Sequence, residues 1–367
     1  MKKFLLSVLT VLLVISMAGC SKDNNNNNGS KEFESNELYV FNWGEYIDEE
    51  NIKKFEAKYG VRVYYKTFDS NEEMYTAVVG GDKYDIIVPS DYMVERMIKE
   101  KMIQPLDLSL ITNIGALAEG VKSPDYDPKH EYSVPYFQGS VGIAYDKNKV
   151  SLEELEEKGW SILADPKYAG EVYMYDADRD NFLPALKALG YSVNTTSTKE
   201  IEDAYQWLLK QKQDVKPDWV NDIINDYMIG TDGVSDKALA VVYSGAATYI
   251  ISENENVGYY EPKQGTNVWG DAMCIPTTCT NVKLAHAWIN FMLEEEVAEA
   301  NSLWVGYTSS VQAVIDKLSG EGGDFYGIES YTPRVGYPKD EEYHDDVTLD
   351  DGTKLKTKLA ELGVKVK

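Results

Sequence analysis

The sequence predicts an α/β protein built as two lobes. Segments of strand character alternate with segments of helix character along most of the chain, which is typical of sheets flanked by helices. About 330 residues follow the N-terminal region. This is a longer chain than a single hydrophobic core ordinarily stabilises, so two lobes are expected. In the first 100 or so residues after the N-terminal region, segments of strand and helix character alternate, three of each, which indicates a wound sheet.

The elements of the first lobe have recognisable starts and ends. Asp48 can cap a helix that Gly60 ends, Ser70 can cap the next helix, and Ser90 or Asp91 the third. Strands are expected over 38–43, 61–68 and 84–88. Because ligands in such sheets lie beyond the carboxyl ends of the strands, the loops 43–46, 68–70 and 90–92 are expected at the binding site.

A second wound region begins near Gly139. Strands are expected over 141–145, 171–175, 239–243, 257–260 and 271–275. Helices are expected over 183–189, 198–211, 246–253, 284–293 and 348–362.

The N-terminus is typical of an exported lipoprotein. Lys2 and Lys3 precede an apolar stretch, 4–17, that is short for a membrane span and ends in small residues before Cys20. We expect residues 1–20 to be a signal peptide and the sulfur of Cys20 to carry lipid. The Asn-rich segment 21–36 is too polar to bury surface and is expected to be a disordered tether. The mature protein is therefore expected on the outer side of the cell membrane, or in a periplasm, and anchored there.

Charge and cysteine content narrow the classes of partner. With 61 Asp and Glu against 36 Lys and Arg, the surface would repel nucleic acid and attract a small cation. Cys274 and Cys279 could close a small loop or remain free thiols, and the apolar strand-like run around Cys274 favours free thiols. The three histidines and the cysteines show no metal-ligand spacing, and neither a metal nor a cofactor is expected.

Aromatic and acidic residues fall at the expected strand ends. They are Trp43, Glu45, Tyr46, Tyr92, Asp180, Tyr243, Trp269, Asp271 and Tyr307. An ammonium group gains about 0.5–2 kcal/mol over an aromatic face and roughly 1.5–3 kcal/mol from each hydrogen bond to a carboxylate. Two or three ring contacts together with two or three such hydrogen bonds reach a binding free energy of about −8 kcal/mol, which corresponds to micromolar affinity. Sugars also stack on rings and bond to carboxylates, so this pattern alone does not name the ligand.

Six segments together resemble a known family. LYVFNWGEYI, YDIIVPSDYMVERM, YSVPYFQGSVGIAYD, LGYSVNTT, VWGDAMCIP and VGYTSS stand in the order and spacing of the polyamine-binding proteins of spermidine/putrescine ABC transporters. The resemblance runs from about Leu38 to near the C-terminus. It implies the two-lobed periplasmic-binding-protein fold, in which crossing strands form a hinge that closes around the ligand. The lobes implied are 37–139 with 270–313, and 140–269 with 314–367.

The resemblance also implies roles for individual residues. The first strand end supplies Trp43, Glu45 and Tyr46, and the turn after the third strand supplies Ser90 and Tyr92. Further ligand-binding positions fall on Asp180, Tyr243, Trp269, Asp271, Tyr307 and His344.

Four positions depart from the family pattern. A second-lobe carboxylate aligns with Ala177, a tryptophan is Tyr243, a late glutamine is His344, and Gly44 replaces a residue that often bears a hydroxyl. Because these positions touch the part of the site that measures ligand length, spermidine and putrescine both stay open.

The function expected is therefore a monomeric receptor that captures a polyamine and delivers it to the permease subunits of an ABC transporter. A receptor of the same fold for a sugar, amino acid or ferric ion is the alternative. An enzyme is not expected, since paired acids arise by chance in so acidic a chain and no nucleophile elbow, phosphate loop or zinc motif is present.

Overall fold

The computed structural model describes residues 33–220, 228, 230, 233–332, 334–345 and 347–367. The expected signal peptide, Cys20 and the tether as far as residue 32 lie outside the described residues. Across the described ranges, no helix combines the length and apolar character needed to cross a bilayer.

The strands of the described chain pair into one curled sheet in the order β2-β1-β3-β9-β4-β7-β5-β6, with β8 and β10 also paired to β4. The strands are β1 (Glu37–Trp43), β2 (Arg62–Phe68), β3 (Ile86–Ile87), β4 (Ser133–Asp146), β5 (Val172–Tyr175), β6 (Asp218–Val220), β7 (Leu239–Tyr243), β8 (Val257–Tyr260), β9 (Val268–Cys274) and β10 (Thr308–Ser309). β1 pairs in parallel with β2 and β3, whereas β9 and β4 run antiparallel to their neighbours β3 and β7.

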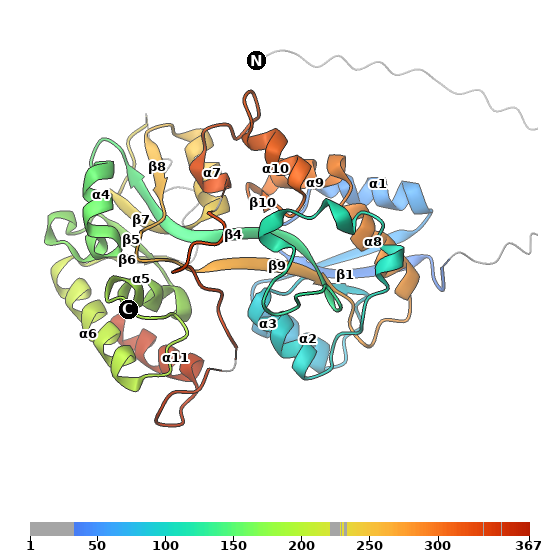
Figure 1. Ribbon diagram of the computed structural model, residues 1–367, viewed down its shortest axis with the longest axis horizontal. Helices are drawn as coiled ribbons and strands as arrows, with labels where there is room; N and C mark the ends of the chain where they lie inside the picture. The colour runs from blue at the N-terminus through green and yellow to red at the C-terminus, as the bar shows by residue number, and fades with distance from the viewer. Residues whose placement is uncertain (1–32, 221–227, 229, 231–232, 333, 346) are drawn as a thin grey trace, which may run out of the picture. The chain divides into compact units, whose positions relative to one another are not determined.

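Helices cover the sheet on both sides of its centre (Figure 1). They are α1 (Glu49–Tyr59), α2 (Asn71–Val79), α3 (Asp91–Lys99), α4 (Leu152–Lys158), α5 (Asp178–Ala188), α6 (Thr198–Asp214), α7 (Ser244–Glu253), α8 (Val282–Met292), α9 (Glu295–Val305), α10 (Gln312–Ser319) and α11 (Leu355–Val366).

Strand β4 belongs to two parts of the sheet. Its residues up to Ser140 pair with β9 and β10, and from Val141 onward it pairs with β7 and β8. All 14 residues of β4 are buried. Figure 1 shows β4 and β9 extending between the group of α4, α5, α6 and α11 and the group of α1, α2, α3 and α8.

Separate hydrophobic clusters form on either side of this central pair. One contains β5, β7, α5 and α6 together with the C-terminal helix α11. Two others lie around β1, because its alternate residues face opposite sides: Leu38 and Val40 join one cluster and Phe41 the other. The first of these two clusters also includes Val314 and Tyr331.

Most predicted elements are confirmed within one or two residues. The predicted helix 49–59 and strand 239–243 match α1 and β7, and the side chains of Asp48 and Ser70 accept the capping hydrogen bonds. The prediction of a C-terminal helix from residue 348 was wrong at its start. Leu349 and Thr353 instead bracket a tight turn, in which Gly352 has a φ of 84°, and α11 begins at Leu355.

Candidate functional site

Asp271 on β9 is one of two buried acids of the predicted site. Its Oδ2 accepts a 2.5 Å hydrogen bond from the hydroxyl of Tyr46, and its backbone pairs with Ser90. Burial raises the pKa of Asp271 to about 6, although the hydrogen bonds from Ser90 and Tyr46 favour the charged form. Near neutral pH, therefore, a carboxylate that is 5% exposed holds a negative charge in a poorly hydrated position and favours a neighbouring cation.

Aromatic rings surround the neighbouring position. Trp269 lies two residues before Asp271 on the same strand and hence on the same face. The Trp269 ring meets the Tyr307 ring edge-on at 5.0 Å and the Tyr243 ring at 6.0 Å, and the Tyr46 ring lies 5.7 Å from that of Tyr307. These four rings form a continuous chain beside the Asp271 carboxylate.

Two glycines let the rings lie against the backbone. A Cβ at Gly139 of β4 would stand 2.5 Å from the Trp269 ring and 2.6 Å from Ser244 Oγ. A Cβ at Gly245, at the start of α7, would collide with the ring of Tyr307. The close approach of β4 and α7 to these rings therefore requires residues without side chains.

Asp180 provides a second buried carboxylate, from the first turn of α5. Its Oδ2 accepts a 2.6 Å hydrogen bond from the Tyr243 hydroxyl and its Oδ1 a 3.2 Å bond from the Tyr343 hydroxyl. Burial raises the pKa of Asp180, while the two tyrosine hydroxyls oppose that shift. Through Tyr243, this acid is connected to the ring chain that ends at Asp271.

Ser90 and Tyr92 are joined by Asn71 at the start of α2. The Asn71 amide donates to Ser90 Oγ at 3.1 Å and to the Tyr92 hydroxyl at 3.0 Å. The guanidinium of Arg179 lies 4.7 Å from the centre of the Tyr92 ring and 5.1 Å from that of Tyr343. Arg179, on α5, thus bridges α3 to the segment that follows residue 334.

The structure brings most of the predicted residues together. We call the connected set the aromatic–acidic cluster: Tyr46, Ser90, Tyr92, Asp180, Tyr243, Trp269, Asp271 and Tyr307. It draws on the loop after β1, the last residue of β7, the first half of β9, the starts of α3 and α5, and the loop before β10. Trp269 and Asp271 therefore lie within a strand and not at its end.

The remaining three predicted residues lie apart from this set. The Trp43 indole donates to the Val88 carbonyl at 2.9 Å and packs on Phe68. Glu45 is exposed and has a left-handed φ of 51°. The His344 side chain is 49% exposed and its Nδ1 lies 3.9 Å from Glu95, while its carbonyl accepts from Arg179.

Three buried polar atoms of this region have no hydrogen-bond partner in the described part of the chain. They are Trp269 Nε1, Asp271 Oδ1 and Asp91 Oδ2. A buried polar atom without a partner costs about 1–3 kcal/mol, more for a charged group. One unpaired donor and two unpaired acceptors, close to a ring chain, are the features of a site that a polar ligand completes.

Sequence reasoning missed five residues at this site. Arg179 and Tyr343 contact the cluster, Asn71 positions it, and Asp91 and Glu342 add acidic groups. Asp91 was predicted in the loop 90–92 at the binding site and as a possible helix cap, but Ser90 occupies the cap position and Asp91 Oδ1 accepts from the backbone of Tyr92 at 2.6 Å. The segment around Glu342 has no strand or helix pattern, and only the resemblance pointed to it, through His344.

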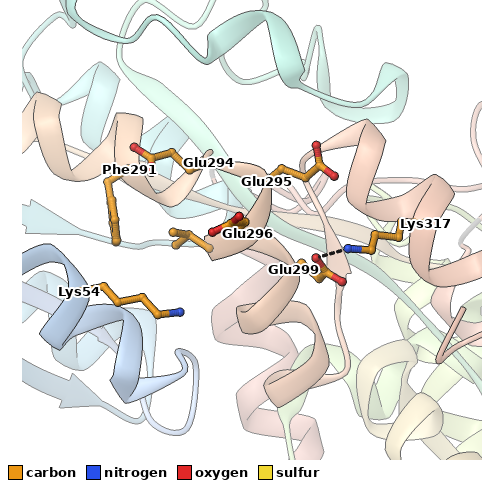
Figure 2. A pocket seen from close by; sticks show the side chains of 8 residues that line it. Lys54, Phe291, Glu294, Glu295, Glu296, Glu299 and Lys317 are labelled. Carbon is orange, nitrogen blue, oxygen red and sulfur yellow. Dashed lines mark hydrogen bonds and ion pairs between the residues drawn. The ribbon is translucent and has the colours of Figure 1, made fainter. Parts of the chain in front are cut away.

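Two hollows accompany this arrangement. A cavity of about 100 Å³ is lined by Trp269, Tyr126 and Glu342, among others, on the side of the cluster. A larger, open hollow of about 550 Å³ lies over α9 and shares no residue with the cluster (Figure 2). Glu295 and Glu296 are exposed there, Glu294 pairs with Lys58, and Glu299 pairs with Lys317 at 2.6 Å. An acidic, solvated surface of this kind needs no ligand.

Cysteines and acids do not assemble a metal centre in the described ranges, where no group of three His, Cys, Asp or Glu could hold an ion. Cys274 and Cys279 are buried free thiols, as the apolar run around Cys274 favoured. The thiol of Cys279 donates to Asp85 Oδ1 at 3.2 Å.

Comparisons with known proteins agree with this fold. The family described as bacterial extracellular solute-binding protein matches residues 81–319. The spermidine/putrescine-binding periplasmic protein of Escherichia coli strain K12 is 34% identical over 290 residues, which are 78% of this chain and 81% of that protein. Spermidine/putrescine-binding periplasmic protein 1 of Haemophilus influenzae is 29% identical over 321 residues, covering 85% and 87%.

Solved structures extend the likeness. A spermidine/putrescine ABC transporter substrate-binding protein of Streptococcus pneumoniae is 32% identical with a TM-score of 0.74, over 90% of this chain and 98% of that one. A lipoprotein of Treponema pallidum is 28% identical with a TM-score of 0.69, over 90% and 99%. The predicted two-lobed α/β fold is thereby confirmed, and the chain belongs to the bacterial extracellular solute-binding protein family.

Proposed function

We propose that this protein is a receptor for a small polyamine, such as spermidine or putrescine, and delivers it to an ABC permease. The observation that carries the proposal is the Asp271 carboxylate, buried beside the rings of Trp269 and Tyr307, with one oxygen unpaired. An ammonium group there gains a charge-assisted hydrogen bond and contact with aromatic faces. A neutral sugar would leave the charge of Asp271 uncompensated.

The second buried acid, Asp180, indicates that the ligand carries two ammonium groups. Asp180 is connected to Asp271 through the rings of Tyr243 and Trp269, so an apolar linker between two ammonium groups can lie along them. This matches a flexible diamine or triamine in both charge and apolar content. The polyamine-binding relatives support the same ligand class.

We further propose that the ligand-binding set comprises the aromatic–acidic cluster, with Trp43, Glu45 and His344 at its margin. The lobes would be 37–139 with 270–313 and 140–269 with 314–367, hinged at β4 and β9.

A receptor role accounts for the site without catalysis, since a ligand completes it through hydrogen bonds and ring contacts alone. The relatives named above are binding proteins of transporters, which supports the same view. We propose a monomer, held at the outer face of the membrane by lipid on Cys20 and by the tether. The lipoprotein among the solved relatives supports this anchor. Mass spectrometry of Cys20 in the cell-derived protein tests it, and an unmodified cysteine would reject it.

Calorimetry of the purified protein tests the polyamine proposal. Titration with spermidine and with putrescine at neutral pH should give saturable heat and a micromolar or tighter Kd. Because a ligand that binds only the folded state stabilises it, Tm should rise in parallel. A panel that includes a sugar, a neutral amino acid and ferric ion separates the alternatives, and a response to one of these without a response to polyamines would overturn the proposal.

A further inference from the structure

Arg334 joins its own segment of the chain to the segment that precedes β9. Its guanidinium donates to the Asp340 carboxylate from Nε at 2.8 Å and from Nη2 at 2.7 Å, which is the bidentate geometry of a strong ion pair. It also donates to the backbone carbonyls of Glu261 at 3.0 Å and Pro262 at 2.9 Å. The Arg334 side chain is 24% exposed and that of Asp340 is 4% exposed, so these contacts are largely shielded from water.

Glu261 extends this network to strand β4. Its Oε2 lies 3.4 Å from Arg334 Nε, and its carboxylate accepts a hydrogen bond from the hydroxyl of Ser140. The Ser140 hydroxyl also lies 3.0 Å from that of Tyr259 on β8. Ser140 is the last residue of β4 that pairs with β9, and Val141 is the first that pairs with β7. Arg334 is therefore connected to the point at which β4 passes from one part of the sheet to the other.

Asp340 extends the network to the start of β9. Its Oδ1 accepts from the backbone of Thr266 at 2.9 Å. The next residue, Glu341, continues the contact, since its backbone donates to the Thr266 carbonyl at 3.0 Å and accepts from Val268 at 3.1 Å. Trp269 follows Val268 directly on β9. The position of the Trp269 indole consequently depends on how the segment around Asp340 holds the start of this strand.

The acids of this network are matched by cations. Glu261 and Asp340 share Arg334, and Glu341 forms an ion pair with Lys187, which is 3% exposed. Because these carboxylates are already paired, the network does not offer a site for a ligand ammonium. Its contacts are with the strands β4 and β9, at which we place the hinge.

We propose that Arg334 is a positioning residue for the ligand site, which fixes β4 and the start of β9 to each other and thereby holds Trp269 in the orientation that ligand binding requires. Arg334 and Trp269 line the same cavity of about 100 Å³. Trp269 Nε1 has no hydrogen-bond partner among the described residues, so the ring depends on its backbone and on packing for its orientation. This inference rests on the proposed receptor function. A site formed in advance retains its ligand longer, so the loss of Arg334 speeds dissociation.

Stopped-flow kinetics and calorimetry with spermidine at neutral pH test this role. Arg334→Gln removes the charge, whereas Arg334→Lys keeps the charge but lacks the planar group that contacts a carboxylate and two carbonyls together. Both variants should raise Kd by about 3- to 30-fold through the dissociation rate, with an association rate within about twofold of wild type. Arg62→Gln makes the same change at a side chain that is 69% exposed, and it should leave Kd unaltered.

Tryptophan fluorescence of the ligand-free protein separates positioning from general stabilisation. Arg334→Gln should change the emission spectrum, and the change should disappear in a Trp269→Phe background. The effects of Arg334→Gln and Trp269→Phe on Kd should also be non-additive, as expected for residues that act through one another. A variant that lowers Tm but keeps the wild-type spectrum and Kd would show that Arg334 only stabilises the fold, which would reject the proposal.

The outcomes separate this role from the function on which it rests. If the wild-type protein binds neither spermidine nor putrescine, the proposed function fails, and the spectra of the ligand-free variants then decide whether Arg334 positions Trp269. If the wild-type protein binds and both Arg334 variants keep Kd within about twofold, the receptor function stands and the positioning role is rejected. Should Arg334→Gln fail to fold, Arg334→Lys carries the same test, because it retains the charge that the two carboxylates require.

Discussion

Asp271→Asn distinguishes a carboxylate that binds ligand from one that supports the fold. The pKa of about 6 in the folded protein lies above the ordinary value near 4, which corresponds to roughly 3 kcal/mol. Because the folded-state pKa is the higher one, protonation stabilises the fold fully below about pH 4, and this stabilisation is lost as pH rises through about 6. At pH 7 the ionised carboxylate therefore costs stability in the ligand-free protein.

Asparagine at this position resembles the protonated acid. It can still accept the hydrogen bond from Tyr46, so the free energy of unfolding at pH 7 should stay the same or rise by at most about 3 kcal/mol. Ligand affinity should fall, because a hydrogen bond to a charged group is worth roughly 1.5–3 kcal/mol. That loss corresponds to about 10- to 150-fold in Kd.

Denaturant unfolding of the ligand-free protein and calorimetry with spermidine measure the two effects separately. Asp324→Asn makes the same chemical change at an exposed position and serves as the matched control. A ligand-free variant that loses several kcal/mol of stability would show that Asp271 supports the fold. An affinity within twofold of wild type would show that it does not contact the ligand, and either result refutes the reasoning.

Three further predictions concern the same cluster. Polyamine affinity should fall about tenfold per pH unit as the solution is acidified below about pH 6, where Asp271 takes up a proton, and a flat calorimetric profile between pH 5 and 7 would contradict this. Gly139→Ala should displace the Trp269 ring, lower stability by about 1–3 kcal/mol and change tryptophan fluorescence; an unaltered spectrum and Tm would argue against the close contact. Tyr243→Phe removes the 2.6 Å donor to Asp180, so stability at pH 7 should fall by about 1–3 kcal/mol and by less below pH 4, while an equal loss at both pH values would show that the hydroxyl does not stabilise the charged acid.

Local patterns in the sequence predicted most of the fold. The helix 49–59 was predicted with both ends, because Asp48 supplies a side-chain acceptor and Gly60 adopts the left-handed φ of 65° that ends a helix. The strand 239–243 was predicted because five apolar residues in succession suit a strand buried on both faces. Both signals depend only on residues adjacent in the chain.

Errors arose where distant residues decide the local structure. Strand β4 is longer than its apolar pattern indicated, because its first half pairs with β9 and its second half with β7 and β8. Helix α5 begins at Asp178, and its start was predicted at residue 183 because the four residues from Asp178 to Asn181 are all polar and show no apolar period. The polar first turn is stabilised where Asp180 accepts from two tyrosines of other segments.

For the site, the sequence by itself determined which groups are present and that strand ends would gather several of them. The carboxyl ends of the parallel strands β1 and β3 meet at one edge, so Tyr46 and Ser90 could be expected together. Only the tertiary structure decided that Glu45 and His344 lie in solvent while Glu342 lines the cavity beside Trp269. Glu342 is positioned by the ion pair of its neighbour Glu341 with Lys187, which lies about 150 residues earlier in the chain. Such a contact depends on tertiary packing, and no pattern of adjacent residues encodes it.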